Sequence, residues 1–168
     1  MVNFEIVLAE AKDADSIMGL IMELAEFENM STSVRITSAV IAKDLENGRC
    51  FAYLAKLNTD DGNGGMVVGM ALCFYAYSTW EGAFLFLEDL YVKQEFRSKG
   101  VGRALFLRVV KRCQEEGLPR LQLNVLNWNK KAIDFYHKMG AINLTADQGW
   151  LMYRIEQDTL AKIECPDS

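Results

Sequence analysis

A short basic segment with two glycines, residues 97–102 (Arg-Ser-Lys-Gly-Val-Gly), is well suited to bind an anion. It lies between an apolar stretch typical of a strand and an apolar stretch typical of a helix. Glycines at such a turn let backbone N–H groups approach a bound group, and the helix start adds N–H donors and partial positive charge. With Arg103, the segment predicts a phosphate or pyrophosphate site. Its glycine spacing is neither the Rossmann nor the P-loop pattern, and a plain tight turn is the alternative interpretation.

A second segment joins a helix-start residue to an aromatic pair. Asn129 stands where a helix N-cap belongs, and Phe135 and Tyr136 follow about two turns later. Phe135 fits a core position. Taken alone, Tyr136 is a core or surface aromatic residue.

The charge balance favours a small cationic partner over nucleic acid. The chain has 168 residues, with 18 basic against 23 acidic side chains and a net charge of −5. No Lys/Arg-rich block offsets this acidity, so nucleic acid is not an expected partner. An acidic surface raises the local concentration of cations.

Cysteine and histidine spacing predicts no metal site. Cys50, Cys73, Cys113 and Cys165 form no CxxC pair, and His137 is the single histidine. The cysteines are expected to be reduced thiols, with Cys73 in the core and His137 on a helix surface. No signal peptide or membrane-length apolar run is visible, so the sequence predicts a soluble cytoplasmic protein without a membrane partner.

Hydrophobic periodicity predicts the elements that position these residues. Asp13 or Asp15 is expected to cap a first helix ending near Glu28, whose apolar face includes Ile17, Leu20, Ile21, Leu24 and Phe27. Thr37 is expected to cap a second helix over 38–46. Two further helices are expected over 100–116 and 129–139, and a short one at the C-terminus. Strands are predicted over 4–9, 50–57, 66–77, 83–92, 121–125 and 149–155, with a turn cluster at 60–65.

This order predicts one domain over residues 1–168. Strands dominate the middle of the chain, and the second half alternates helix and strand. The stretches 66–77 and 83–92 are expected to be antiparallel neighbours. The fold class is therefore α/β, a mixed sheet with helices on both faces.

The combined pattern resembles the GNAT acetyltransferase superfamily. It consists of a long strand, an Arg-x-x-Gly-x-Gly helix start, a strand, and an Asn-capped helix with a Phe-Tyr pair. Further motifs resemble the diamine (spermidine/spermine-type) N-acetyltransferase family: Leu24-Ala25-Glu26-Phe27-Glu28, Tyr77-Ser78-Thr79-Trp80, Leu87-Glu88-Asp89, Val125-Leu126-Asn127-Trp128-Asn129 and Gly149-Trp150. Within that family, 25–28 and 125–129 are more similar to the thialysine N-epsilon-acetyltransferase branch.

The resemblance implies a mostly antiparallel sheet whose two central parallel strands splay, with acetyl-CoA in the cleft and no metal. The backbone of Leu90, Tyr91 and Val92 would pair with the pantetheine arm. The remaining implied acetyl-CoA residues are Arg97, Ser98, Lys99, Gly100, Val101, Gly102 and Arg103 at the pyrophosphate, and Asn129, Lys130, Lys131 and Ala132 on the other side.

The resemblance also implies direct transfer of the acetyl group to a neutral amine. Tyr136 matches the family's general acid, which protonates the leaving thiolate. An alkylammonium has a pKa of about 10.4, so its proton must first be removed. Glu88 matches the carboxylate that binds and deprotonates the amine, through water. Asp89 is next on the strand and is expected on the opposite face, without a catalytic role.

The implied amine-binding residues are Phe27, Glu28, Glu88, Gln122, Leu123, Asn124 and Gln148. Spermine-binding members place a glutamate at the position before Gly-Trp, where this chain has Gln148. Losing that carboxylate weakens the site for a second or third ammonium. Sulfur in thialysine also lowers the pKa of its amine. Both points favour thialysine-like substrates, although diamines and polyamines stay open.

Two other functions compete with a small-amine acetyltransferase. A protein N-terminal or lysine acetyltransferase would need an open groove, whereas the acidic residues favour a small-cation pocket. A non-catalytic acetyl-CoA-binding protein would not need Tyr136. The family resemblance also implies a homodimer.

Overall fold

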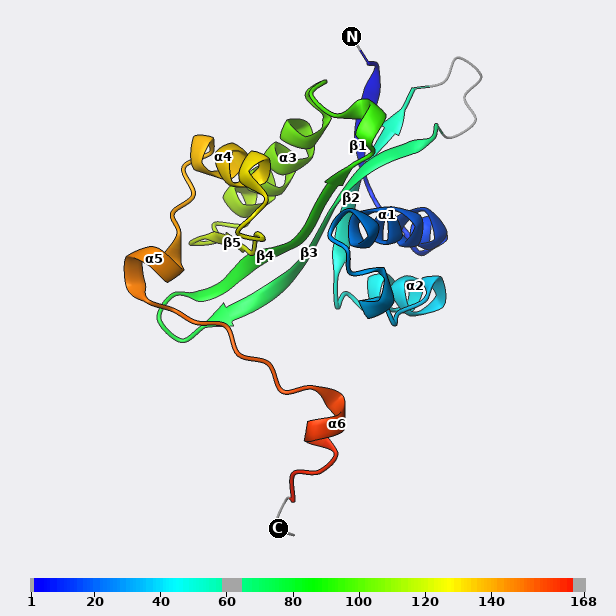
Figure 1. The fold of residues 1–168 in the computed structure, drawn as a ribbon. Helices are drawn as coiled ribbons and strands as arrows, with labels where there is room; N and C mark the ends of the chain where they lie inside the picture. The colour runs from blue at the N-terminus through cyan, green and yellow to red at the C-terminus, as the bar shows by residue number, and fades with distance from the viewer. Residues whose placement is uncertain (1, 59–64, 165–168) are drawn as a thin grey trace. The chain divides into compact units, whose positions relative to one another are not determined.

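The computed structural model describes residues 2–58 and 65–164, and Figure 1 shows their helices and strands. In chain order the elements are β1 (Phe4–Leu8), η1 (Ala11–Asp13), α1 (Ala14–Phe27), η2 (Ser31–Ser33), α2 (Ser38–Glu46), β2 (Phe51–Leu57), β3 (Val67–Ser78), β4 (Gly82–Val92), η3 (Gln94–Phe96), α3 (Val101–Glu115), β5 (Leu121–Leu123), α4 (Lys130–Lys138), α5 (Leu144–Gln148) and α6 (Gln157–Leu160). Cys165 and the predicted turn cluster, except Gly65, lie outside the described residues.

The chain divides into two compact units, Met1–Asn124 and Val125–Ser168. The first unit holds a five-stranded sheet in the order β1-β2-β3-β4-β5. Neighbouring strands from β1 to β4 are antiparallel, and β4 and β5 are parallel. The predicted mixed sheet and the antiparallel pairing of β3 with β4 are confirmed.

Helices cover both faces of this sheet, as predicted. Figure 1 shows α1 and α2 on one face and α3 on the other. On the first face, Ile17 and Leu20 from α1 and Ile41 from α2 pack into a buried cluster with Leu54 and Met70. This apolar burial holds the helices on the sheet. The other predicted α1 positions are less buried: Ile21 and Leu24 are half-buried, and Phe27 is 41% exposed.

The start of α1 uses Asp13 differently from the predicted cap. The Asp13 side chain makes no cap hydrogen bond to α1. Its Oδ2 accepts a 2.9 Å bond from the Glu10 N–H, and its Oδ1 accepts a 2.8 Å bond from Lys56 Nζ. Burial alone would raise the pKa of Asp13, but these two partners lower it below its usual value. The Thr37 cap of α2 is confirmed, since its hydroxyl accepts from the Val40 N–H.

The second unit contains α4, α5 and α6. Asn129 caps α4 as predicted: its Oδ1 accepts a 3.2 Å bond from the Ala132 N–H. Asn143 caps α5, a short helix that the sequence analysis did not predict. Among the described residues, no helix has the length and apolar character needed to cross a bilayer.

The predicted strand at 149–155 is wrong. The structure assigns no strand there, and the side chains from Trp150 to Ile155 are exposed. Alternating residue types indicate which side chains could share a face, but a strand also needs a neighbouring edge for its backbone. The predicted strand over 121–125 is likewise shorter, because β5 ends at Leu123.

Candidate active site

β4 and β5 part at the position of Glu88. Their parallel pairing covers three positions and ends at Leu87 and Leu123, whereas β4 continues to Val92. On the β3 side, Cys73 pairs with Leu87 and Leu72 pairs with Asp89, so Glu88 is an extra residue in the ladder. Such a β-bulge bends a strand and re-aims its side chains. It also interrupts the strict alternation of faces on which the sequence analysis placed Asp89.

The separation of the strands leaves one edge of β4 without a strand partner over 88–92 in the part of the chain that the structure describes. Leu90 and Val92 are half-buried there, and Tyr91 is buried. Backbone N–H and C=O groups need hydrogen-bond partners. This edge therefore suits an extended ligand with amide groups, the type of group that the pantetheine arm carries. The Val92 carbonyl accepts a 2.9 Å bond from Arg97 Nε.

The turn between β4 and α3 presents backbone N–H groups to solvent. Gly100 has φ +88°, the left-handed region that favours glycine, and Ser98 has φ +60°. Gly100 occupies the N-cap position of α3, and no side chain caps the helix there. The first N–H groups of α3 therefore have no intrahelical partner. Left-handed residues in a turn also gather N–H groups into a concavity that binds anions.

The side chains around this turn add positive charge. Arg97, Lys99 and Arg103 are exposed, and Lys99 Nζ lies 5.5 Å from the centroid of the Phe96 ring. Val101 is 1% exposed and fixes the start of α3 to the core. Gly102 is half-buried. A Cβ on Gly100 would meet nothing within 4 Å, so the turn is open on that side. Free N–H donors, flanking cations and open space fit a pyrophosphate.

Two carboxylates, Glu28 and Glu88, act on a third, Asp89, near the bulge. Burial raises the pKa of Asp89 to about 6, and the charges of Glu88 and Glu28 add to this shift. Burial also raises the pKa of Glu28, which follows the last residue of α1. Glu88 is exposed. The structure thus brings the predicted amine-site residues Glu28 and Glu88 into the surroundings of Asp89.

The other predicted amine-site residues of the first unit lie on or beside β5 and α1. Gln122 and Leu123 are half-buried in β5, and Asn124 follows as an exposed residue. Phe27 is the last residue of α1. Gln122 pairs in register with Phe86, two residues before Glu88.

In the second unit, α4 carries the predicted general acid. Tyr136 is 9% exposed, and its ring makes an edge contact with Phe135 at a centroid distance of 5.3 Å. Lys130 and Lys131 begin α4 and are exposed; Lys130 Nζ donates a 2.9 Å bond to the Asn127 carbonyl. Ala132 is half-buried.

Gln148 is the last residue of α5 and is exposed. Its Oε1 accepts a 3.1 Å bond from Trp150 Nε1. This contact needs only an acceptor oxygen, so a glutamate could also make it.

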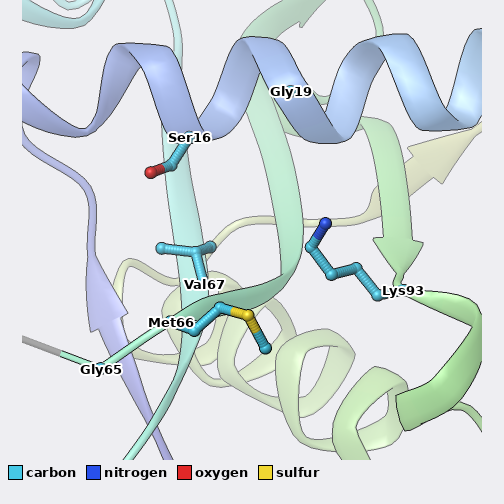
Figure 2. A pocket seen from close by; sticks show the side chains of 6 residues that line it. All are labelled: Ser16, Gly19, Gly65, Met66, Val67 and Lys93. Atoms are coloured by element: carbon cyan, nitrogen blue, oxygen red, sulfur yellow. The ribbon is translucent and has the colours of Figure 1, made fainter.

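A separate pocket of about 400 Å³ lies beside α1. Figure 2 shows Ser16 and Gly19 from α1 facing Met66, Val67 and Lys93 across it. None of the residues described as lining it is a predicted site residue, and Lys93 is ion-paired with Glu23. The pocket is therefore distinct from the candidate site.

The sequence did not indicate that Asp89 lies within the electrostatic influence of both Glu28 and Glu88. The effect of the Glu28 charge on the pKa of Asp89 has no signal in the sequence, because the two residues come near each other only once α1 packs on the sheet. Sequence reasoning also missed Glu23, one helical turn before Phe27. The i, i+4 spacing of Glu23 and Phe27 was visible and indicates that they share a helix face.

The model of the acetyltransferase (GNAT) family matches residues 16–141. A thialysine N-epsilon-acetyltransferase from Caenorhabditis elegans is 38% identical over 162 residues, which cover 96% of this chain and 98% of that protein. The enzyme of the same name from Bos taurus is 36% identical over 164 residues, or 94% and 96% of the two chains. A human spermidine/spermine N(1)-acetyltransferase-like protein 1 is 31% identical over 94% of this chain but only 23% of its own length.

Solved structures share the fold at lower identity. An aminoglycoside acetyltransferase from an uncultured soil metagenomic sample has a TM-score of 0.74 at 17% identity, covering 92% of this chain and 97% of its own. A ribosomal-protein-alanine N-acetyltransferase from Brucella melitensis has a TM-score of 0.70 at 20% identity, covering 92% and 99%. These likenesses confirm the predicted fold class. The matched family model and the near full-length relatives show that this chain belongs to the acetyltransferase (GNAT) family of acyl-transfer enzymes.

Proposed function

We propose that this protein transfers the acetyl group of acetyl-CoA to the primary amine of a small cationic molecule, with thialysine-like amino acids as the preferred class. The observation that carries the proposal is the identity of 35–38% to four thialysine N-epsilon-acetyltransferases over nearly their whole lengths. GNAT acetyltransferases use acetyl-CoA as co-substrate. The unpaired edge of β4 and the open turn at 97–102 support binding of this co-substrate.

The carboxylates near the β4 bulge support a cationic substrate. A partly buried carboxylate such as Asp89 is more stable in its charged form when a positive charge lies beside it. An ammonium between Glu28, Glu88 and Asp89 would supply that charge. In the proposed reaction, Glu88 accepts the ammonium proton through water, and the neutral nitrogen attacks the thioester carbonyl. The carbon–sulfur bond then breaks, and the Tyr136 hydroxyl gives its proton to the departing thiolate. The nitrogen, which is positively charged after its attack, loses its extra proton to the resulting phenolate through water, so the products are the neutral amide, free CoA and a restored Tyr136 hydroxyl.

The test is a panel of amines assayed with acetyl-CoA. Thialysine, ornithine, putrescine, spermidine and spermine would be compared by kcat/KM at fixed ionic strength, with release of free CoA as the readout. We expect transfer to at least one small amine and the highest value for thialysine. No transfer to any of these amines, with transfer to a peptide instead, would overturn the proposal.

A polyamine is the second candidate substrate. The similarity to the human spermidine/spermine N(1)-acetyltransferase-like protein over 94% of this chain favours it. Gln148 argues against it, because a neutral amide offers no charge to a second or third ammonium. The amine panel separates the two candidates directly.

Domain organisation and assembly complete the proposal. We propose that 1–168 form one functional domain, because the family model runs across the division at Asn124 and Val125.

We also propose a cytoplasmic homodimer. The free thiols of Cys50, Cys73 and Cys113 support a reducing compartment. Light scattering on the purified protein tests the dimer, whose expected mass is twice the 19.0 kDa of one chain.

A further inference from the structure

One side chain connects the end of α1 with the turn before α3. The guanidinium carbon of Arg97 lies 5.1 Å from the centroid of the Phe27 ring and 5.3 Å from that of the Tyr91 ring. Its Nε also donates to the Val92 carbonyl. Arg97 thus contacts α1 and β4 while it begins the segment predicted to hold pyrophosphate. These contacts fall within the range in which a cation is attracted to an aromatic face.

The partners of Arg97 are themselves fixed between β4 and α1. Tyr91 is 7% exposed, and its hydroxyl donates a 3.2 Å bond to Glu23 Oε2. Lys93 forms an ion pair with the other oxygen of Glu23. Burial and the Glu23 charge raise the pKa of Tyr91, while the neighbouring Arg97 opposes that shift. Tyr91 is therefore neutral, and its buried, hydrogen-bonded side chain holds the ring in place beside the guanidinium.

Phe27 lies at the edge of the core, where Arg97 contacts its ring. Its side chain is 41% exposed, although it belongs to the apolar face of α1. The last turn of α1 contains no basic residue, so Arg97 provides a cation to that end of the helix from another element. Glu28 follows Phe27 directly. A contact that holds Phe27 therefore holds the end of α1 from which Glu28 follows.

We propose that Arg97 is a positioning residue that couples the two substrates, by holding Phe27 at the end of α1 against the turn at 97–102. The inference rests on the proposed function, in which the turn binds acetyl-CoA and Glu28 faces the amine. Because Arg97 Nε donates to the Val92 carbonyl, the terminal N–H groups are those that would meet a pyrophosphate. A pyrophosphate that binds them fixes the guanidinium plane, and that plane fixes the Phe27 ring. Acetyl-CoA then raises the affinity for the amine, and the amine raises that for acetyl-CoA by the same factor.

Hydrogen exchange tests the contact without any ligand. Phe27→Leu removes the ring and keeps an apolar side chain of similar size. We expect amide exchange to become several-fold faster in the peptide covering 93–97, where the N–H groups of Lys93, Phe96 and Arg97 are hydrogen-bonded. Phe51→Leu is the matched control, since the centroid of the Phe51 ring lies 4.1 Å from the Arg112 guanidinium carbon at the far end of α3. It should leave exchange at 93–97 unchanged. Unchanged exchange in Phe27→Leu, or an equal effect of Phe51→Leu, would overturn the proposal.

A double-mutant cycle on acetyl-CoA binding tests whether Phe27 affects acetyl-CoA affinity through Arg97. Arg97→Lys keeps the charge but loses the flat guanidinium and its Nε bond. Calorimetry without amine should show about two- to fivefold weaker binding for Phe27→Leu, the scale of one cation–π contact. In the Arg97→Lys background, Phe27→Leu should have no further effect. If Phe27 only contacts the amine, Phe27→Leu raises the amine KM and leaves acetyl-CoA affinity unchanged, which contradicts the proposal.

The two experiments also separate this inference from the proposed function. A wild type that binds no acetyl-CoA would defeat the proposed function, and hydrogen exchange would still decide whether Arg97 links α1 to the turn. If the wild type acetylates amines but the effects of Phe27→Leu and Arg97→Lys on acetyl-CoA affinity simply multiply in the double variant, the proposed role of Arg97 fails and the proposed function stands.

Discussion

Asp89 is a carboxylic acid that the fold destabilises in its charged form. Burial raises its pKa to about 6, and Glu88 and Glu28 add negative charge nearby. Above pH 6 the folded protein holds this charge at a free-energy penalty. This free-energy penalty disappears as the pH falls toward the usual pKa of an aspartate. A partly buried carboxylate of this kind is expected where a ligand supplies the missing cation.

We therefore predict that Asp89→Asn stabilises the protein at pH 8 and not at pH 4. A shift of about two pKa units corresponds to at most about 3 kcal/mol, so we expect about 1–3 kcal/mol at pH 8. Urea unfolding of both proteins at the two pH values measures it. The same variant should raise the KM for the amine. A stability gain that is equal at both pH values would show that the charge of Asp89 is not its cause.

Tyr136 differs from Asp89 because its proposed role is chemical. We predict that Tyr136→Phe lowers kcat by about 10²-fold or more, the usual scale of proton transfer by a side chain. The phenylalanine ring keeps the apolar contact with Phe135, so acetyl-CoA affinity should change by less than twofold. Steady-state kinetics and calorimetry give the two values. Near-normal turnover would remove Tyr136 from the mechanism.

At the scale of elements, two features define the turn before α3: the left-handed backbone of Gly100, and a helix start that no side chain caps. We predict that Gly100→Asp weakens acetyl-CoA binding at least tenfold, because it adds strain at φ +88° and puts a negative charge at the anion site. Gly117→Asp is the matched control: Gly117 has φ +63°, open space around its Cβ, and a position past the other end of α3. Both variants should lose similar stability, and only the first should lose affinity in calorimetry. Equal losses of affinity would contradict a pyrophosphate site here.

The end of α5 concerns selectivity. Gln148→Glu keeps the oxygen that accepts from Trp150 Nε1 and adds one negative charge. We predict that it raises kcat/KM for spermine relative to thialysine. An exposed ion pair contributes about 0–1 kcal/mol, so the ratio should shift by up to about fivefold. If the ratio of kcat/KM for spermine to that for thialysine is the same in Gln148→Glu and the wild type, Gln148 does not set selectivity.

The sequence predicted the elements whose signals are local. The bounds of α2, its Thr37 cap, the Asn129 cap of α4 and the uncapped glycine start of α3 were visible within a few residues. Features that depend on distant segments were missed or wrong. Arg97 stacks on Phe27 across 70 positions of chain, Glu28 acts on Asp89 across 61, and residues 149–155 form no strand despite their alternating pattern. Local periodicity does not encode which edges and faces meet.

At the scale of the whole molecule, the net charge of −5 favours cations. A protein's summed field raises the local concentration of an oppositely charged substrate, and salt screens that field. Spermine carries more positive charges than thialysine and responds more strongly to the same field. The interaction at the carboxylates beside β4 is partly buried, and salt affects it less.

We predict that kcat/KM falls with ionic strength for both amines and falls more steeply for spermine. Raising salt from 0.05 to 0.5 M shortens the Debye length from about 14 Å to about 4 Å, below the dimensions of the protein. The measurement uses saturating acetyl-CoA, so weaker co-substrate binding at high salt does not enter. Glu115→Gln is a useful comparison, since it removes one exposed negative charge at the C-terminal end of α3, outside the proposed site. It should flatten the spermine slope slightly and leave kcat unchanged. Equal slopes for the two amines would show that contacts inside the site, rather than the field of the whole protein, govern the capture of substrate.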